Sequence, residues 1–227
     1  MTEPQQRRPL AIVFLAVGIL TFGGSSVLIR LCAFPSGLVA SLRMAIAGLV
    51  LLPFVAGKLE ALARAIGIRR LAALLVPGIL LGIHFHLWVA GVRLTTVAAA
   101  TFIFATNPVL FAIVEVAVYR RHLAWTDWLA ITLVATGGAW ILLSGGGRAD
   151  LAGILLCFAS TAVFVAYLVA ARATSPGVPH PTFMSLIYLA GGALTLPLAL
   201  LGGGTSTAAW TDGGAWLALA ALALLPT

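Results

Sequence analysis

Apolar runs long enough to cross a lipid bilayer recur along the whole sequence. A hydrocarbon core about 30 Å thick is spanned by roughly 18 or more apolar residues in an α-helix. Runs near this length are Leu10–Leu28, Gly37–Val55, Leu71–Val92, Val97–Val118, Trp128–Leu143, Leu151–Ala171 and Phe183–Leu201. With 62% apolar and 8% charged residues, the chain cannot form a water-soluble surface. We therefore predict an all-α polytopic membrane protein with seven complete transmembrane helices. A shorter run from Gly214 to Thr227 predicts a partial eighth helix or a surface segment.

The net charge of +7 comes from basic residues in the connections between apolar runs. This distribution predicts a lipid bilayer as partner and no nucleic acid, which would require a basic soluble face. With a cytoplasmic N-terminus, the inside segments hold Arg7, Arg8, Lys58, Arg64, Arg69, Arg70, Arg120, Arg121 and Arg172, and the outside loops hold Arg30, Arg93 and Arg148. This bias predicts a multi-pass protein of the cytoplasmic membrane whose N-terminus lies on the cytoplasmic side. The longest connection, Ala56–Arg70, is predicted to be a basic loop with an amphipathic surface helix.

Two other readings of local features are weaker. Arg7 and Arg8 before an apolar run resemble a secretory signal, but no small-residue cleavage site follows. The two cysteines, Cys32 and Cys157, have no spacing that suggests a disulfide framework or a metal site. We expect them to be small apolar fillers and expect no metal and no cofactor.

Weak internal matches suggest a repeat. Gly18–Leu31 aligns with Ser160–Ala173, and Pro35-Ser36 aligns with Pro181-Thr182, at offsets of about 142 and 146 residues. We predict a five-helix repeat at 1–145 and a partial second repeat at 151–227, with helices six, seven and the start of eight. Because five is odd, the second copy enters the membrane inverted, as in many secondary transporters.

Several motifs resemble those of one protein family. They are Gly23-Gly24-Ser25, Pro35 and Arg43, then His84-Phe85-His86-Leu87-Trp88, Thr95-Thr96-Val97-Ala98, Asn107-Pro108 and Leu224-Leu225-Pro226-Thr227. Together they resemble an EamA-type permease of the drug/metabolite transporter superfamily. The resemblance implies ten helices in two halves around a central cavity, and ATP-independent export or exchange of amino acids or other small metabolites. Tyr119-Arg120 stands where that family usually has Gly-Glu, so a role of that glutamate is not carried over.

Depth along the helices indicates which polar groups can meet. Arg43 lies about 10 Å below the outer boundary and His84 about 20 Å above the inner one, at nearly the same level as Gly23 and Ser25. A membrane-embedded arginine is costly unless it faces a cavity or a partner. We expect Arg43 to bind a carboxylate or phosphate of the substrate. The alternative is that it binds helix-end carbonyls or extends to the interface.

The paired histidines do not predict a metal site. His84 and His86 point about 200° apart on a helix, whereas His84 and Trp88 share a face and are predicted to line the cavity. The alternative places His84 against a neighbouring helix and Trp88 in an aromatic belt. In the second half, Tyr167 and Tyr188 are the available polar aromatics, and we take Tyr167 as a candidate substrate contact.

Helix interruptions are predicted at Gly23-Gly24 and Asn107-Pro108, which mark a site or, for the glycines, close packing. Asn107 is expected to bind the substrate or a neighbouring helix. Glu115, about 5 Å above the inner boundary, is a weak candidate for proton coupling. Its alternative role is an ion pair with Arg120 or Arg121.

These residues predict a secondary transporter that moves a small polar metabolite, such as an amino acid, by alternating access. A homodimer is compatible with the sequence. An intramembrane enzyme is disfavoured, because it requires a nucleophile with a base, paired carboxylates or several metal ligands at one depth. A non-transporting truncated remnant remains a third reading, because the second repeat stops inside its third helix, with roughly 70 residues of a full-length pair missing.

Overall fold

The computed structural model describes residues 21, 23–143, 150–202 and 207–224, and every element within these ranges is an α-helix. A helical segment at 23–31 precedes α2 (Ser36–Ile66), α3 (Ile68–Ala73), α4 (Leu75–Leu94), α5 (Val97–Ala105), α6 (Asn107–Ala117), α7 (Trp125–Leu143), α8 (Leu151–Thr174), α9 (His180–Gly202), α10 (Thr207–Thr211) and α11 (Gly213–Leu224). Most of Leu10–Leu28 and the last three residues of Gly214–Thr227 lie outside the described residues, and so do Arg7, Arg8 and Arg148.

Five stretches of the described residues are long and apolar enough to cross a membrane: Ser36–Lys58, Ile68–Leu94, Val97–Ala117, Leu151–Thr174 and His180–Leu201. They coincide with five of the seven predicted spans. The predicted count of seven is not confirmed, because most of the first run lies outside the described residues and α7 is not among the five. Gly213–Leu224 is a shorter apolar helix, as predicted for a partial span.

Local sequence explains where several helices begin and end. The Thr96 hydroxyl accepts a hydrogen bond from Ala99 N at 3.1 Å and caps α5, and Asp150 caps α8 through Ala152 N at 3.0 Å. The helix predicted within Ala56–Arg70 is confirmed, and it is a continuation of α2 as far as Ile66. Good helix formers and the exposed Glu60–Arg64 pair favour this extension. Gly67 then adopts a φ of 76°, which ends the helix.

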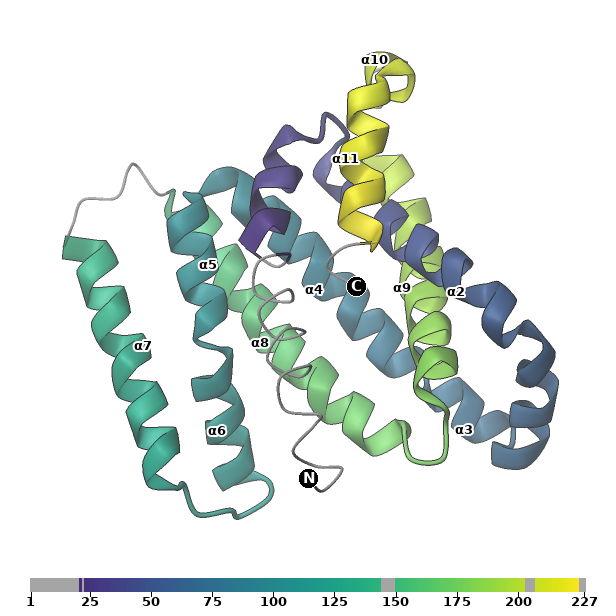
Figure 1. The fold of residues 1–227 in the computed structure, drawn as a ribbon, viewed down its shortest axis with the longest axis horizontal. Helices are drawn as coiled ribbons and strands as arrows, with labels where there is room; N and C mark the ends of the chain where they lie inside the picture. The colour runs from purple at the N-terminus through teal and green to yellow at the C-terminus, as the bar shows by residue number, and fades with distance from the viewer. Residues whose placement is uncertain (1–20, 22, 144–149, 203–206, 225–227) are drawn as a thin grey trace, which may run out of the picture.

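The helices form one bundle with two distinct ends (Figure 1). We call them the Pro35 end, where α2 and α8 begin and α4 and α9 finish, and the Gly67 end, where α2 and α8 finish and α4 and α9 begin. α2 packs antiparallel against α9, and α4 packs against both α8 and α9. α5 and α6 lie between α8 and the peripheral α7.

Glycines allow the central helices to approach closely. A Cβ at Gly192 on α9 would lie 2.8 Å from Ala45 N on α2, and one at Gly153 on α8 would lie 2.7 Å from the carbonyl carbon of Leu94. These contacts are with backbone, which cannot move aside as a side chain does. Small residues therefore set the separation of the α2–α9 and α4–α8 pairs, as is common in membrane bundles.

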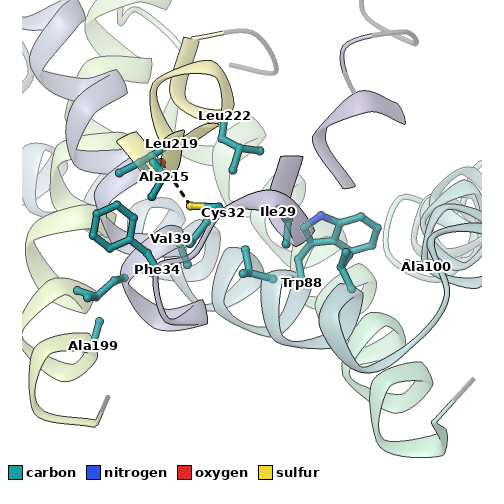
Figure 2. Close-up of a cluster of buried hydrophobic side chains, with 14 of the residues drawn as sticks. Ile29, Cys32, Phe34, Val39, Trp88, Ala100, Ala199, Ala215, Leu219 and Leu222 are labelled. Carbon is teal, nitrogen blue, oxygen red and sulfur yellow. Dashed lines mark hydrogen bonds between the residues drawn. The ribbon is translucent and has the colours of Figure 1, made fainter. Parts of the chain in front are cut away.

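A buried apolar cluster joins α11 to the Pro35 end (Figure 2). The ring of Phe34 packs edge-on against Trp210 and Trp216, with centroids 5.2 and 5.1 Å away. The thiol of Cys32 donates to Ala215 O at 3.6 Å. Burial raises the pKa of this thiol, so Cys32 remains protonated and poorly reactive near neutral pH.

Candidate functional site

A cavity of about 260 Å³ lies among six helical segments at the centre of the bundle. Its lining residues are Ser25, Arg43, Leu81, His84, Phe85, Trp88, Phe104, Phe164, Tyr167, Leu168, Met184 and Tyr188. The structure thus brings together five of the predicted substrate residues: Ser25, Arg43, His84, Trp88 and Tyr167. Gly23 and Asn107 are not part of this lining.

Arg43 is the cationic residue of the cavity wall. It is 2% exposed, and its guanidinium carbon lies 4.1 Å from the centroid of the Phe85 ring. Its Nε has no hydrogen-bond partner, and Arg43 takes part in no ion pair with a described carboxylate. A cation over an aromatic face is stabilised by about 1–2 kcal/mol, less than a buried guanidinium loses with its water. The site therefore favours an anionic group beside Arg43.

His84 is held in a defined orientation by α8. Its Nδ1 lies 2.9 Å from Ser160 O and 2.8 Å from the Ser160 hydroxyl, which also lies 3.1 Å from His84 O. A protonated Nδ1 donates to Ser160 O, whereas a bare Nδ1 accepts from the Ser160 hydroxyl, so both neutral tautomers of the ring are bonded to Ser160. His84 both lines the cavity and contacts a neighbouring helix, so the two predicted alternatives for this residue hold together.

Aromatic rings make up much of the remaining wall. The His84 ring lies 4.8 Å from Phe164 and is stacked with Trp88 at 6.5 Å. Phe104 contacts Trp88 at 5.3 Å, and Phe164 contacts Tyr167 at 5.5 Å. Phe85, Phe104 and Phe164 were not predicted as cavity residues, because phenylalanines in apolar helices carry no local mark that separates a cavity wall from a lipid-facing surface.

The two predicted helix interruptions have different outcomes. Residues 23–31 are helical, so the predicted break at Gly23-Gly24 is wrong. A helix in the membrane accommodates glycine without losing its backbone hydrogen bonds, which explains the difference. The break at Asn107-Pro108 is observed as the separation of α5 from α6 at Thr106. The Asn107 amide nitrogen and oxygen have no hydrogen-bond partner and lie outside the cavity lining.

Glu115 lies away from the cavity, toward the Gly67 end. Its carboxylate is 2.8 Å from Arg172 on α8 and 3.6 Å from Arg121. The predicted pair with Arg121 is confirmed, and Arg172, which also lies 4.7 Å from the Tyr119 ring centroid, was not foreseen. These contacts link α6 to α8.

At the Pro35 end, two arginines cross-link α4 and the helical segment at 23–31, each binding carbonyl oxygens of the helix that carries the other. Arg93 on α4 donates to Ile29 O at 3.2 Å and Cys32 O at 2.7 Å, at the end of the first helical segment. Arg30 on that segment donates to Val92 O at 3.0 Å and to Thr95 O, at the end of α4. Each guanidinium therefore satisfies the unpaired carbonyls at the negative end of the other helix.

The described residues contain no group of three His, Cys, Asp or Glu side chains that could hold a metal ion. The polar groups of the cavity lining are hydroxyls, one imidazole, one indole N–H and one guanidinium. Such a set suits recognition of a small molecule by hydrogen bonds and charge.

Comparison with known proteins gives a family match and several matches among solved structures. The model of the EamA-like transporter family matches residues 9–143. A crystal structure of a protein with 22% sequence identity superposes with a TM-score of 0.61, over 93% of this chain and 75% of that one. At this identity the second likeness concerns the fold alone. None of the curated proteins compared matches the chain.

Proposed function

Because the chain belongs to the EamA-like transporter family, a family of membrane transporters and not enzymes, we propose that it is a secondary transporter of a small zwitterionic metabolite such as an amino acid. The cavity is the substrate site of this proposal. Alternating access would expose it to one side of the cytoplasmic membrane and then to the other.

The observation that carries the proposal is the pairing of complementary groups in one small cavity. Arg43 offers N–H donors with no described carboxylate to neutralise them, which suits a substrate carboxylate. In the tautomer whose Nδ1 donates to Ser160 O, His84 Nε2 is an acceptor and suits a substrate ammonium group. Trp88, Phe104 and Phe164 give an apolar surface for the rest of the molecule. Tyr167 and Ser25 complete the wall with hydroxyl groups.

The directions of the helices support a five-helix repeat followed by a partial second repeat in the inverted orientation. The segment at 23–31 runs toward the Pro35 end, whereas α8, its predicted counterpart, runs toward the Gly67 end (Figure 1). α2 and α9, a second predicted pair, are also antiparallel and pack against each other near Ala45 and Gly192. The offset of about 146 that relates Pro35 to Pro181 places Ala45 opposite Gly191, beside that contact. A two-fold relation through this crossing supports repeats at 1–145 and 151–227.

The Glu115–Arg172 ion pair at the Gly67 end joins the two repeats, whereas the arginine–carbonyl bonds at the Pro35 end lie within one repeat. Glu115 on the first repeat binds Arg172 on the second, so separation of the repeats at that end would break the contact. Arg30 and Arg93 both belong to the first repeat and would move together. Glu115 is therefore proposed as part of a gate, with proton coupling as its second candidate role.

For orientation, we propose that the Gly67 end is cytoplasmic and that the N-terminus lies on the same side. Lys58, Arg64, Arg69, Arg70, Arg120, Arg121 and Arg172 belong to the Gly67 end, which fits the positive-inside rule. At the other end, Arg30 and Arg93 are occupied by helix-end carbonyls.

Cysteine labelling tests this orientation. Lys58→Cys and Arg120→Cys should react with a membrane-impermeant maleimide only from the cytoplasmic side, and Asp212→Cys only from the outside. The native Cys32 and Cys157 are buried and should give little background. Labelling of positions 58 and 120 from opposite sides would contradict the proposed topology.

Exchange in proteoliposomes tests the proposed function. Vesicles loaded with one unlabelled amino acid at a time should take up the same labelled amino acid faster than protein-free vesicles for at least one of the common amino acids. Decarboxylated and deaminated analogues of that substrate should compete poorly, because each lacks one of the two charged groups. Absence of exchange for every amino acid would contradict the substrate class, and failure of small metabolites of other classes as well would contradict a transport function.

A further inference from the structure

A second polar group lies on the other side of α4 from the substrate cavity. His86 on α4, Ser41 on α2 and Thr195 on α9 form a continuous chain of hydrogen bonds. Ser41 Oγ lies 3.2 Å from His86 Nε2 and 3.0 Å from Thr195 Oγ1. At 1.5 Å per residue, these residues lie about 8–12 Å from the Pro35 ends of their helices, inside the membrane-spanning segments.

The hydrogen-bonded chain begins and ends at a backbone carbonyl oxygen. His86 Nδ1 lies 2.8 Å from Gly82 O, and the Thr195 hydroxyl donates to Gly191 O at 2.7 Å. Since carbonyls only accept, His86 Nδ1 must carry a hydrogen and Thr195 must direct its hydroxyl hydrogen at Gly191. The middle of this hydrogen-bonded chain is buried, because Ser41 is 0% and Thr195 is 9% exposed.

The number of available hydrogens differs between the neutral and the protonated form of His86. The chain has four contacts, from Gly82 O through His86, Ser41 and Thr195 to Gly191 O. A neutral imidazole with the two hydroxyls supplies three hydrogens, so one buried contact has none. An imidazolium supplies the fourth: Nε2 donates to Ser41, Ser41 donates to Thr195, and Thr195 donates to Gly191 O. Only the protonated ring satisfies every contact, and an unsatisfied buried polar contact costs about 1–3 kcal/mol.

We infer that His86, Ser41 and Thr195 form a proton-binding site and that a proton is the coupling ion of this transporter. The inference rests on the proposed function and adds the ion to it. The step is simple: a proton from water adds to His86 Nε2, the Ser41 and Thr195 hydroxyls turn in one direction, and no covalent bond breaks. The site is separate from the cavity, because His84 faces α8 and the substrate while His86 faces α2 and α9.

Charged and titratable groups near His86 lie on α4, α2 and α9. On α4, Arg93 is on the same face about 10 Å toward the Pro35 end, where it binds Ile29 O and Cys32 O, and His84 is on the opposite face. On α2, Arg43 is turned about 200° from Ser41 and lies at Phe85. On α9 the titratable groups are His180 and Tyr188, and Tyr188 lines the cavity.

No carboxylate of the described residues contacts His86. The positive ring is instead stabilised by the Gly82 carbonyl and by the Ser41 hydroxyl, whose dipole points away from it.

The position of the site gives the proton a way to act on transport. Ser41 and His86 belong to the first repeat and Thr195 to the second, so the protonated chain strengthens the α2–α9 contact between them. Loss of the proton removes the hydrogen from one of its contacts. Proton binding therefore favours the arrangement in which α2, α4 and α9 are joined, and a ligand that distinguishes two arrangements shifts their populations.

Substrate accumulation driven by a pH gradient tests the inference. The full chain is reconstituted, and the probe is the amino acid that exchanges fastest in the screen above. With one proton per substrate, a gradient of one pH unit should change the steady-state accumulation about tenfold. We expect this ratio for the wild type and for the matched control His122→Gln, an exposed histidine between α6 and α7. For His86→Gln we expect a ratio of about one. An unchanged ratio in His86→Gln, or a wild-type ratio of one, would overturn the inference.

A second measurement does not depend on transport or on a disruptive variant. The protonation midpoint of His86 is followed by nitrogen NMR of histidine-labelled protein, with its signal assigned by loss in His86→Gln. Thr195→Val keeps the side-chain shape but removes the contact that requires the fourth hydrogen, so the midpoint should fall by about one pH unit. An unchanged midpoint, or a ring that stays neutral between about pH 5 and 8, would overturn the proton site. If the wild type exchanges no amino acid, the proposed function is contradicted, and the NMR measurement still shows whether His86, Ser41 and Thr195 bind a proton.

Discussion

Replacing Arg43 with alanine should reduce amino-acid affinity about 100-fold or more, because two charge-assisted hydrogen bonds of about 1.5–3 kcal/mol each are lost. The same change should leave the thermal stability of the purified protein equal or higher. Arg43 is buried without an ion pair to a described carboxylate, and its Nε has no partner, so its removal eliminates a desolvated charge.

Loss of affinity without loss of stability would show that Arg43 binds the substrate and is not needed to hold the fold together. Equilibrium binding and exchange measure the first effect, and a thermal-shift assay in detergent measures the second. Arg43→Lys is the matched control: it keeps the charge but loses the planar fork, and should retain affinity between those of the wild type and Arg43→Ala. If Arg43→Ala bound substrate normally, or lost both affinity and stability in equal measure, Arg43 would have a structural role only.

Replacing Gly192 with valine should prevent formation of a stable, monodisperse protein. A Cβ at this position would lie 2.8 Å from Ala45 N and 3.0 Å from Ala45 Cα, so α2 and α9 must separate to make room for it. Overpacking typically costs about 1–3 kcal/mol, and here the obstructing atoms are backbone and cannot adopt another rotamer. Separation would also disturb the Ser41–Thr195 bond and the cavity wall formed by both helices.

Gly57→Ala is the matched control for this prediction. Gly57 lies within α2, and nothing comes within 4 Å of a Cβ built there. Alanine should be neutral or stabilise α2 by up to about 1 kcal/mol, through its higher helix propensity. Size-exclusion chromatography and thermal unfolding of fluorescent fusions measure both variants. Normal stability of Gly192→Val would show that the α2–α9 contact is looser than the structure indicates.

The positions of the histidines show how far helical periodicity alone can lead. A helix turns about 100° per residue, so His84 and His86 had to face different neighbours, and His84 and Trp88 had to share a surface. The structure confirms this, with His84 bonded to Ser160 and His86 bonded to Ser41. Depth along each helix also predicted that Ser25, Arg43 and His84 meet, because rise per residue is constant. The partners themselves were not predictable, since rotation about each helix axis depends on packing.

Glu115 illustrates what local reasoning misses. Its neighbour in sequence, Arg121, was a natural candidate for an ion pair, but the closer partner is Arg172 from another helix. A helix within Ala56–Arg70 was predicted, but its continuity with α2 was not, because a basic, less apolar stretch can form a separate surface helix or extend the preceding one. Its Glu60–Arg64 spacing was the available sign.

The amino-acid sequence by itself determined the helical, membrane-spanning character of this protein, because water and lipid leave few conformations open to long apolar runs. It also determined the levels and faces of polar residues within each helix, which follow from constant helical geometry. Only the tertiary structure decided which faces meet: the aromatic cavity around Arg43, the Ser41–His86–Thr195 chain and the glycine contacts between α2 and α9. These depend on packing between residues that are far apart in the chain, and interchangeable apolar side chains do not encode that choice locally.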